Sequence, residues 1–105
     1  MQKTRLRHVV LFGFKDATSD EEIDEIVRRF AALPEEIPGI EAFECGVNNS
    51  PEGIDRGHSH CFILTFASEA ARDAYLPHPA HEAFVAFASE WIGNALVIDY
   101  WAQEP

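Results

Sequence analysis

Two predicted strands of this chain, residues 5–14 and 58–66, are apolar on both faces, and this constrains the fold more than any other feature. Side chains alternate between the two faces of a strand, so neighbours such as Val9 and Val10 point to opposite sides. A sheet made of such strands has to be covered on both sides, because a whole apolar face left in water would be unusually large for a single domain.

The other elements follow from local helix and strand signals. Overlapping capping boxes predict that a helix starts near Ser19, and Pro34 together with the turn at residues 37–39 is predicted to end it. Residues 48–57 have the composition of a loop. The remaining segments are a strand over 40–47, a short helix over 69–75, a longer helix over 79–92 and a last strand over 95–101.

The resulting order, β-α-β-β-α-β, predicts an α+β protein with a ferredoxin-like fold and one antiparallel four-stranded sheet. A chain of 105 residues supports one core, so residues 1–105 are predicted to form a single domain. The helices can cover one face of the sheet, and no element remains for the other. We therefore expect a homodimer in which two sheets pack face to face.

Charge and composition exclude several partners. The net charge is −10, from 18 acidic and 8 basic residues, which disfavours nucleic acid and anionic membrane surfaces. No apolar run approaches the ~20 residues of a membrane span, and the N-terminal apolar run is too short for a signal peptide. The two cysteines, Cys45 and Cys61, are predicted to be buried and reduced, which suits a cytoplasmic protein.

The segment 75–81 concentrates polar side chains and prolines between two helices. Pro77 ends the first helix, and Pro79 occupies the first position of the second. His81 then falls in the first turn, near the middle of an apolar stripe that includes Phe84. A histidine aimed at the core in this way is either a structural residue or part of a pocket wall.

Two further histidines interrupt apolar strand faces. His8 shares its face with Val10 and Phe12, and His60 shares its face with Phe62. These side chains are expected to line a space between sheet and helices, together with the helix-borne tyrosine and histidine. A histidine and a tyrosine in an apolar pocket can act as general base and as oxyanion donor for a carbonyl substrate. The structural alternative is that each histidine only donates to a backbone carbonyl in the core.

A metal site is the other use for these histidines. His58 and His60 are spaced for one strand face, and His78 and His81 for one helix face. Antiparallel strands, however, place His8 and His60 towards opposite ends, and no carboxylate or thiol is spaced to complete the ligands. The chain also has no Gly-rich phosphate loop and no Gly-x-Ser-x-Gly motif. We predict neither a metal nor another cofactor.

Several motifs together resemble those of the stress-responsive dimeric α/β-barrel (Dabb) family, over essentially the whole chain. They are His8-Val-Val-Leu-Phe, Phe14-Lys-Asp, Pro38-Gly39-Ile40, Gly57-His-Ser-His60, Phe66, Tyr75, His78-Pro-Ala-His81 and Asp99-Tyr100. The resemblance implies a ferredoxin-like subunit and a homodimer closed into a barrel.

The resemblance also implies a site. One plant member of the family is a polyketide cyclase, and its working tyrosine and histidine match Tyr75 and His81. His8 and His60 match further pocket histidines of that member.

We therefore expect a cofactor-independent enzyme, cyclase-like or lyase-like, that acts on a small apolar carbonyl compound. His81 is the predicted base, and Tyr75 the predicted donor to the oxyanion. The alternative is a non-catalytic ligand-binding or stress-response protein that uses the same pocket. The predicted substrate-binding residues are His8, Val10, Phe12, Val27, Phe30, His60, Phe62 and Phe84.

Overall fold

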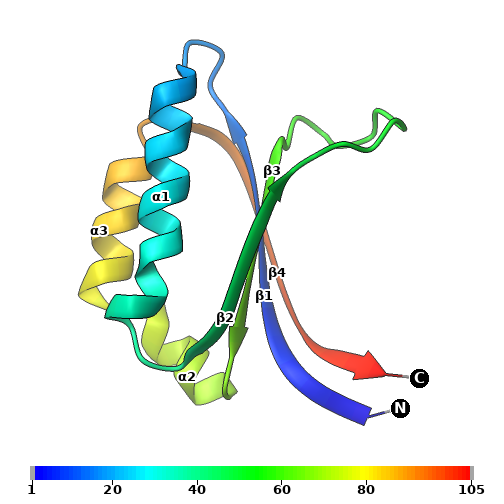
Figure 1. The fold of residues 1–105 in the computed structure, drawn as a ribbon, viewed down its shortest axis with the longest axis vertical. Coiled ribbons are helices and arrows are strands. Elements are labelled where there is room, and N and C mark those ends of the chain that lie inside the picture. Colours follow the sequence, from blue (N-terminus) through cyan, green and yellow to red (C-terminus); the bar gives the residue numbers. More distant parts are fainter. Residues whose placement is uncertain (1, 105) are drawn as a thin grey trace.

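A computed structural model describes residues 2–104, and its order is β-α-β-β-α-α-β. Four strands form one antiparallel sheet in the order β2-β3-β1-β4, with all helices on one side (Figure 1). The predicted α+β class and ferredoxin-like arrangement are therefore confirmed. The elements are β1 (Gln2–Phe14), α1 (Asp20–Glu36), β2 (Ile40–Val47), β3 (His60–Phe66), α2 (Glu69–Tyr75), α3 (Pro79–Ala88) and β4 (Ile92–Glu104).

Helix α1 begins at the predicted cap and ends at Glu36, directly before the predicted turn at residues 37–39. The Ser19 side chain accepts a hydrogen bond from the Glu22 backbone N–H (3.1 Å), and the Glu22 carboxylate accepts one from the Ser19 backbone N–H (2.9 Å). Pro34 lies inside the helix, so the prediction that it ends the helix was wrong. A proline removes one helical hydrogen bond, but Leu33 and Ile37 are both 2% exposed, and their packing stabilises the last turn.

The last strand begins earlier than predicted, and α3 is correspondingly shorter. Helix α3 ends at Ala88, and β4 starts at Ile92 opposite Phe14. The Lys15 backbone N–H donates to the Trp91 carbonyl at 2.8 Å, which joins the end of β1 to the turn before β4. Pairing with the long strand β1 therefore determines the conformation here, rather than the helical spacing of the apolar residues.

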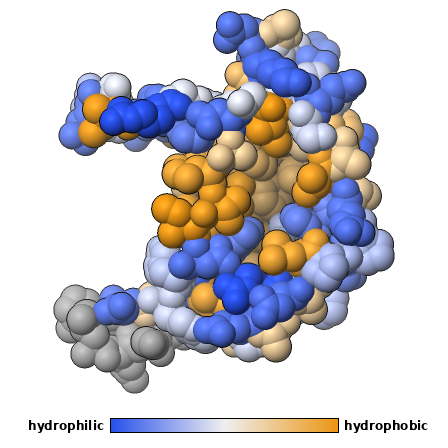
Figure 2. All heavy atoms as spheres, turned by 180° about the vertical axis from the view of Figure 1, so that it is seen from behind, coloured by the Kyte–Doolittle hydropathy of each residue, from blue (hydrophilic) through white to orange (hydrophobic). Residues whose placement is uncertain are grey.

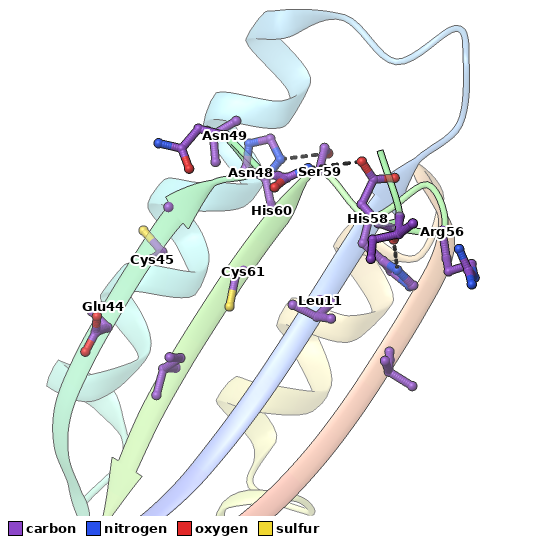
Figure 3. A pocket seen from close by; sticks show the side chains of 16 residues that line it. Leu11, Glu44, Cys45, Asn48, Asn49, Arg56, His58, Ser59, His60 and Cys61 are labelled. Atoms are coloured by element: carbon purple, nitrogen blue, oxygen red, sulfur yellow. Dashed lines mark hydrogen bonds between the residues drawn. The ribbon is translucent and has the colours of Figure 1, made fainter. Parts of the chain in front are cut away.

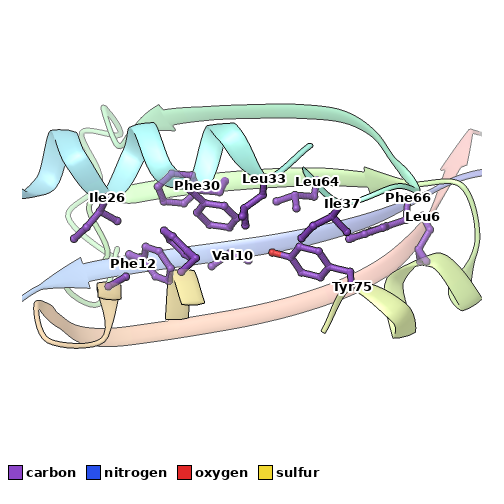
Figure 4. Close-up of a cluster of buried hydrophobic side chains, with 13 residues drawn as sticks. Leu6, Val10, Phe12, Ile26, Phe30, Leu33, Ile37, Leu64, Phe66 and Tyr75 are labelled. Atoms are coloured by element: carbon purple, nitrogen blue, oxygen red, sulfur yellow. The ribbon is translucent and has the colours of Figure 1, made fainter. Parts of the chain in front are cut away.

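The core lies between the sheet and the helices, where buried apolar and aromatic side chains form one cluster (Figure 4). Phe30 of α1 lies at its centre, with ring centroids 4.6 Å from Phe62 of β3 and 4.7 Å from Phe84 of α3. Leu6, Val10 and other residues of this face are also buried. Each such side chain contributes about 1.5–3 kcal/mol through burial.

The opposite face of the sheet is not covered by any element of the described chain, residues 2–104. Leu96, Ile98 and Tyr100 of β4 are 44%, 55% and 47% exposed on this side. Val9 of β1 and Ile63 of β3 lie beside them and are half-buried. Figure 2 shows apolar side chains gathered in a hollow on this side of the molecule. We call this surface the open face.

Both cysteines were predicted to be buried, but neither is. Cys45 is exposed because β2 is an edge strand of the sheet, and Cys61 is partly exposed on the open face. Among the helices of the described residues, none is both long and apolar enough to cross a membrane.

Candidate active site

A cavity of about 390 Å³ lies between the helix-facing side of the sheet and helix α3. Its polar side chains are His8 from β1, Tyr75 from the end of α2, His81 from the first turn of α3, and Ser89 after α3. Among the described residues, no lysine, arginine or carboxylate side chain lines it. The other walls are apolar and include Val10, Phe12, Phe30, Phe84, Val85 and Val97.

The connection between α2 and α3 brings the tyrosine and the histidine together. His78 caps α3, since its Nδ1 atom accepts a hydrogen bond from the Ala80 backbone N–H at 3.0 Å, and Pro79 is the first helical residue. The chain therefore turns sharply after Tyr75. His81 stacks on Tyr75 with ring centroids 4.3 Å apart and a tilt of 40°.

The tautomer of His81 follows from its hydrogen bond. Its Nδ1 atom lies 2.9 Å from the Leu76 carbonyl oxygen. A carbonyl only accepts, so Nδ1 carries the proton. In the neutral ring, Nε2 then holds a lone pair and can take up a proton.

His81 was predicted to lie in the middle of the apolar stripe of α3. It lies instead at the rim of the cavity. It is partly exposed, and Val85 one turn later is 46% exposed. The buried positions of α3 are Phe84 and Ala88. Because Phe84 packs against Phe30 of α1, the buried stripe is rotated towards α1 and away from His81.

Tyr75 occupies the closed end of the cavity. Its side chain is 0% exposed, and its hydroxyl has no hydrogen-bond partner among the described residues. Figure 4 shows the hydroxyl pointing into the buried cluster. Burial raises the pKa of the Tyr75 hydroxyl well above its usual value of 10, so the group remains a proton donor at neutral pH. A buried hydroxyl without a partner is unusual in a folded protein and suits a group that meets a ligand.

The third polar side chain of the cavity, His8, is hydrogen-bonded to an ion pair between Asp99 and Arg72. The His8 Nδ1 atom lies 2.7 Å from Asp99 Oδ1, and Asp99 Oδ2 accepts a hydrogen bond from Arg72 Nη1 at 3.0 Å. This fixes the His8 ring and directs its other nitrogen away from the carboxylate. Asp99 belongs to one of the family motifs, but it was not predicted to be part of the site, because only the strand pairing sets it opposite His8.

Three of the predicted binding residues lie elsewhere. His60 is opposite Phe12 near the start of β3, whereas His8 is opposite Leu64 towards its other end. The His60 ring packs edge-on against Phe14, with centroids 5.2 Å apart, and burial lowers its pKa. Neither His60 nor Phe62 or Val27 lines the cavity. The predicted residues that do line it are His8, Val10, Phe12, Phe30, Tyr75, His81 and Phe84.

The antiparallel pairing of β1 and β3 separates His8 from His60, as predicted. Within residues 2–104, no group of three or more histidine, cysteine, aspartate or glutamate side chains is arranged to hold a metal ion.

The mouth of the cavity was not predicted. Leu76, Val85 and Val97 line the cavity and are 44%, 46% and 54% exposed. Val97 is opposite Val10 in the sheet and faces the helix side, but no helix covers it, because β4 is an edge strand. A ligand therefore meets an apolar entrance between α3 and β4.

The burial of Tyr75 has a measurable consequence at high pH. The chain has two tyrosines, so in a Tyr100→Phe variant the tyrosinate absorbance reports Tyr75 alone. We expect this absorbance to stay low well above pH ~10, the ordinary pKa of tyrosine. The folded state holds the proton more tightly than the unfolded chain, so stability linked to Tyr75 is lost as pH rises through ~10. Titration of the folded variant near pH ~10 would contradict the burial of this hydroxyl.

The fold and the site together define a ferredoxin-like α+β protein with an apolar pocket that carries two histidines and a tyrosine. The model of the Dabb family, the stress-responsive A/B barrel domain, matches residues 6–102. The chain therefore belongs to this family, as its sequence motifs predicted.

Two relatives illustrate the range of the family. The stress-response A/B barrel domain-containing protein HS1 of Arabidopsis thaliana is 38% identical over 98 residues, which cover 93% of this chain and 90% of the relative. Olivetolic acid cyclase of Cannabis sativa is 24% identical over 95 residues, which cover 90% of this chain and 94% of the cyclase.

Solved structures share the fold. The hydroxynitrile lyase of Passiflora edulis superposes with a TM-score of 0.90 at 23% identity, covering 99% of this chain and 98% of the lyase. A dimeric ferredoxin-like protein of unknown function from Jannaschia superposes with a TM-score of 0.79 at 28% identity, covering 92% of this chain and 98% of that one.

Proposed function

We propose that this protein is a cofactor-independent enzyme that performs acid–base chemistry on a small neutral carbonyl compound in the cavity at Tyr75 and His81. The observation that carries the proposal is the buried, unpartnered hydroxyl of Tyr75 beside a histidine whose tautomer leaves Nε2 as a base. The olivetolic acid cyclase relative supports chemistry of the cyclase or lyase kind.

The chemistry assigns one role to each group. His81 Nε2 removes a proton from the carbon next to the carbonyl. The electron pair of that C–H bond forms the carbon–carbon double bond of an enolate, and the π pair of the carbonyl moves onto its oxygen. The Tyr75 hydroxyl donates to this oxygen and stabilises its negative charge. His8, whose ring centroid is 5.7 Å from that of Tyr75, is a second group for moving protons, oriented by Asp99.

The cavity also defines the class of substrate. Its walls are mostly apolar, and no lysine or arginine of the described residues lines it, so a carboxylate or a phosphate would meet no permanent positive charge there. A compact, uncharged aldehyde or ketone with an apolar body fits both the walls and the apolar mouth.

The test compares Tyr75→Phe and His81→Gln with the wild type. Small neutral aldehydes and ketones are first screened for a rise in melting temperature, and the turnover of each compound that binds is followed by NMR. We expect each substitution to lower turnover by about 10²–10⁴-fold, as for a lost general acid or base. Tyr75→Phe should keep the stability of the ligand-free protein, because there it removes only an unpaired hydroxyl.

Tyr100→Phe is the matched control, since Tyr100 lies on the open face away from the cavity. Its turnover should equal that of the wild type. Wild-type turnover by Tyr75→Phe would rule out the proposed role of the hydroxyl.

A non-catalytic binding protein is the second candidate, favoured by the complete burial of the Tyr75 side chain. In that case the same screen finds compounds that bind to the wild type, and none of them is converted.

We also propose that the chain forms a homodimer through its open face. A single subunit would leave an unusually large apolar surface in water there, including Leu96, Ile98 and Tyr100. The Jannaschia protein of the same fold is dimeric. The cytoplasm is the proposed location, because free thiols such as that of exposed Cys45 suit a reducing compartment.

A further inference from the structure

Helix α2 is held against the edge strand β4 by two polar contacts. Trp101 of β4 donates from Nε1 to Glu69 Oε2 at 2.8 Å. Arg72, one helical turn after Glu69, donates from Nη1 to Asp99 Oδ2 at 3.0 Å. Asp99 and Trp101 are two residues apart, so they lie on the same face of β4. Helix α2 is therefore fixed beside the cavity, and a cation is fixed beside Asp99.

The two carboxylate oxygens of Asp99 have different partners. Oδ2 accepts from Arg72, and Oδ1 lies 2.7 Å from Nδ1 of His8. An arginine side chain only donates and keeps its positive charge, so it stabilises Asp99 as a carboxylate. A carboxylate only accepts, and the proton between Asp99 and His8 therefore belongs to Nδ1 of His8.

The charges around His8 favour a neutral ring. His8 is 5% exposed, and Arg72 and Asp99 already form an ion pair beside it. A second proton on His8 would leave this largely buried group of three with a net positive charge, which burial disfavours. In the neutral ring, Nε2 holds a lone pair, and His8 lines the cavity. The ring therefore offers the cavity a hydrogen-bond acceptor.

The inner end of the cavity then combines one free donor with two acceptors. The Tyr75 hydroxyl is free to donate, since it has no partner among the described residues. Nε2 of His81 is one acceptor, because Nδ1 donates to the Leu76 carbonyl, and Nε2 of His8 is the other. The ring centroids of His8 and His81 lie 5.7 and 4.3 Å from that of Tyr75. All three groups therefore act on the same part of a ligand.

A ligand that carries only a carbonyl leaves one of these groups unpaired. Its oxygen accepts from Tyr75, and the C–H group beside it meets the base His81, but nothing donates to His8. An acceptor left unpaired in an apolar cavity lowers the affinity, and a hydroxyl close to the carbonyl would satisfy it.

We propose that the Arg72–Asp99 pair fixes His8 as a hydrogen-bond acceptor, and that the substrate is a hydroxyketone or hydroxyaldehyde whose hydroxyl donates to Nε2 of His8. This substrate class rests on the proposed function and narrows it. Neither Arg72 nor Asp99 lines the cavity, so both are positioning residues that act through His8.

A second hollow has to be distinguished from the cavity in any binding experiment. It is a groove of about 540 Å³ between the open face and the segment of residues 48–59 (Figure 3). Charged side chains contribute to its lining, those of Glu44, Asp55 and Arg56. Changes in NMR shifts at Tyr75 on addition of a ligand indicate binding in the cavity, and changes at Cys61 indicate binding in the groove.

The first experiment measures the dissociation constants of phenacyl alcohol, propiophenone and phenacyl fluoride for the wild type by NMR titration. The ketones are similar in size, but the hydroxyl of the first can donate, the methyl of the second cannot, and the fluorine of the third only accepts. We expect phenacyl alcohol to bind in the cavity about 10-fold more tightly than the other two, as for one net hydrogen bond. In an apolar cavity without an acceptor, the hydroxyl would instead weaken binding.

The failures of the two proposals are distinguishable. Binding of propiophenone in the cavity with equal or weaker binding of phenacyl alcohol would overturn the hydroxyl-bearing substrate and leave the proposed function standing. Failure of all three ketones to bind in the cavity would count against both.

Asp99→Asn tests the source of the acceptor. Because Arg72 only donates, the asparagine turns its oxygen towards Arg72 and its Nδ2 group towards His8. Nδ1 of His8 must then accept, and the ring proton moves to Nε2. The preference for phenacyl alcohol over phenacyl fluoride should fall towards equality, because an N–H group can donate to either. Asp73→Asn is the matched control, since exposed Asp73 accepts from Nε of the same arginine at 2.9 Å, and it should keep the wild-type preference.

Nitrogen NMR of the isotope-labelled protein reads the tautomer of His8 directly, because ring nitrogens with a lone pair and with a proton resonate far apart. The lone-pair signal should come from Nε2 in the wild type and in Asp73→Asn, and from Nδ1 in Asp99→Asn. A merely structural role of Asp99 would not move this signal. A neutral wild-type His8 with its proton on Nε2, or an unchanged ligand preference in Asp99→Asn, would overturn the role of His8. The wild-type titration and spectrum decide the question even if Asp99→Asn does not fold.

Discussion

Replacing Ile98 with glutamate should dissociate the proposed dimer and destabilise the protein by about 3–5 kcal/mol, the cost of an unpaired charge in an apolar interface. Within one subunit Ile98 is 55% exposed, and a substitution at such a position ordinarily changes stability by no more than ~0.5 kcal/mol. The variant is informative because the loss of stability expected for a buried interface is several times the loss expected for an exposed position. Sedimentation gives the mass, and urea unfolding at several protein concentrations gives the stability.

Ala83→Glu on the exposed side of α3 introduces the same charge and should leave mass and stability close to those of the wild type. In a dimer, the unfolding midpoint of the wild type should rise with protein concentration, since association and folding are coupled. An Ile98→Glu protein with wild-type mass and stability would show that the open face is not the interface.

Replacing Phe30 with alanine should lower the free energy of unfolding by about 3–5 kcal/mol. Phe30 is 2% exposed and stacks between Phe62 and Phe84, with Phe43 at a centroid distance of 5.4 Å. The truncation leaves a void lined by rigid rings, which refill it poorly. Because domains of this size are stable by only about 5–15 kcal/mol, a large part of the total stability would be lost.

Urea unfolding of wild type, Phe30→Leu and Phe30→Ala at one protein concentration measures the effect. Phe30→Leu retains most of the side-chain volume and should lose clearly less than Phe30→Ala. Phe30 also lines the cavity at Tyr75, so the alanine variant should accept bulkier ligands at temperatures where it remains folded. A loss below ~1 kcal/mol for Phe30→Ala would show that this stack does not hold the core together.

Local interactions determined most of the fold directly from the sequence. The capping box at Ser19 specifies the start of α1, because its hydrogen bonds involve only neighbouring residues. The prolines at 77 and 79 likewise place Tyr75 at the end of one helix and His81 in the first turn of the next. The apolar pattern on both faces of β1 and β3 also predicted the open face, since strand geometry alone assigns alternate side chains to opposite sides.

Tertiary packing determined two features that the pattern of residues could not predict, the strand register and the position of α3 over the sheet. Strand register, which depends on contacts distant in sequence, sets His8 opposite Asp99 and places His60 away from the cavity. The position of α3 against α1 leaves Val97 at an open mouth and His81 at the rim. Strand alternation gives the face on which a side chain lies, but only the packing of helices on that face determines whether it becomes core, pocket wall or entrance.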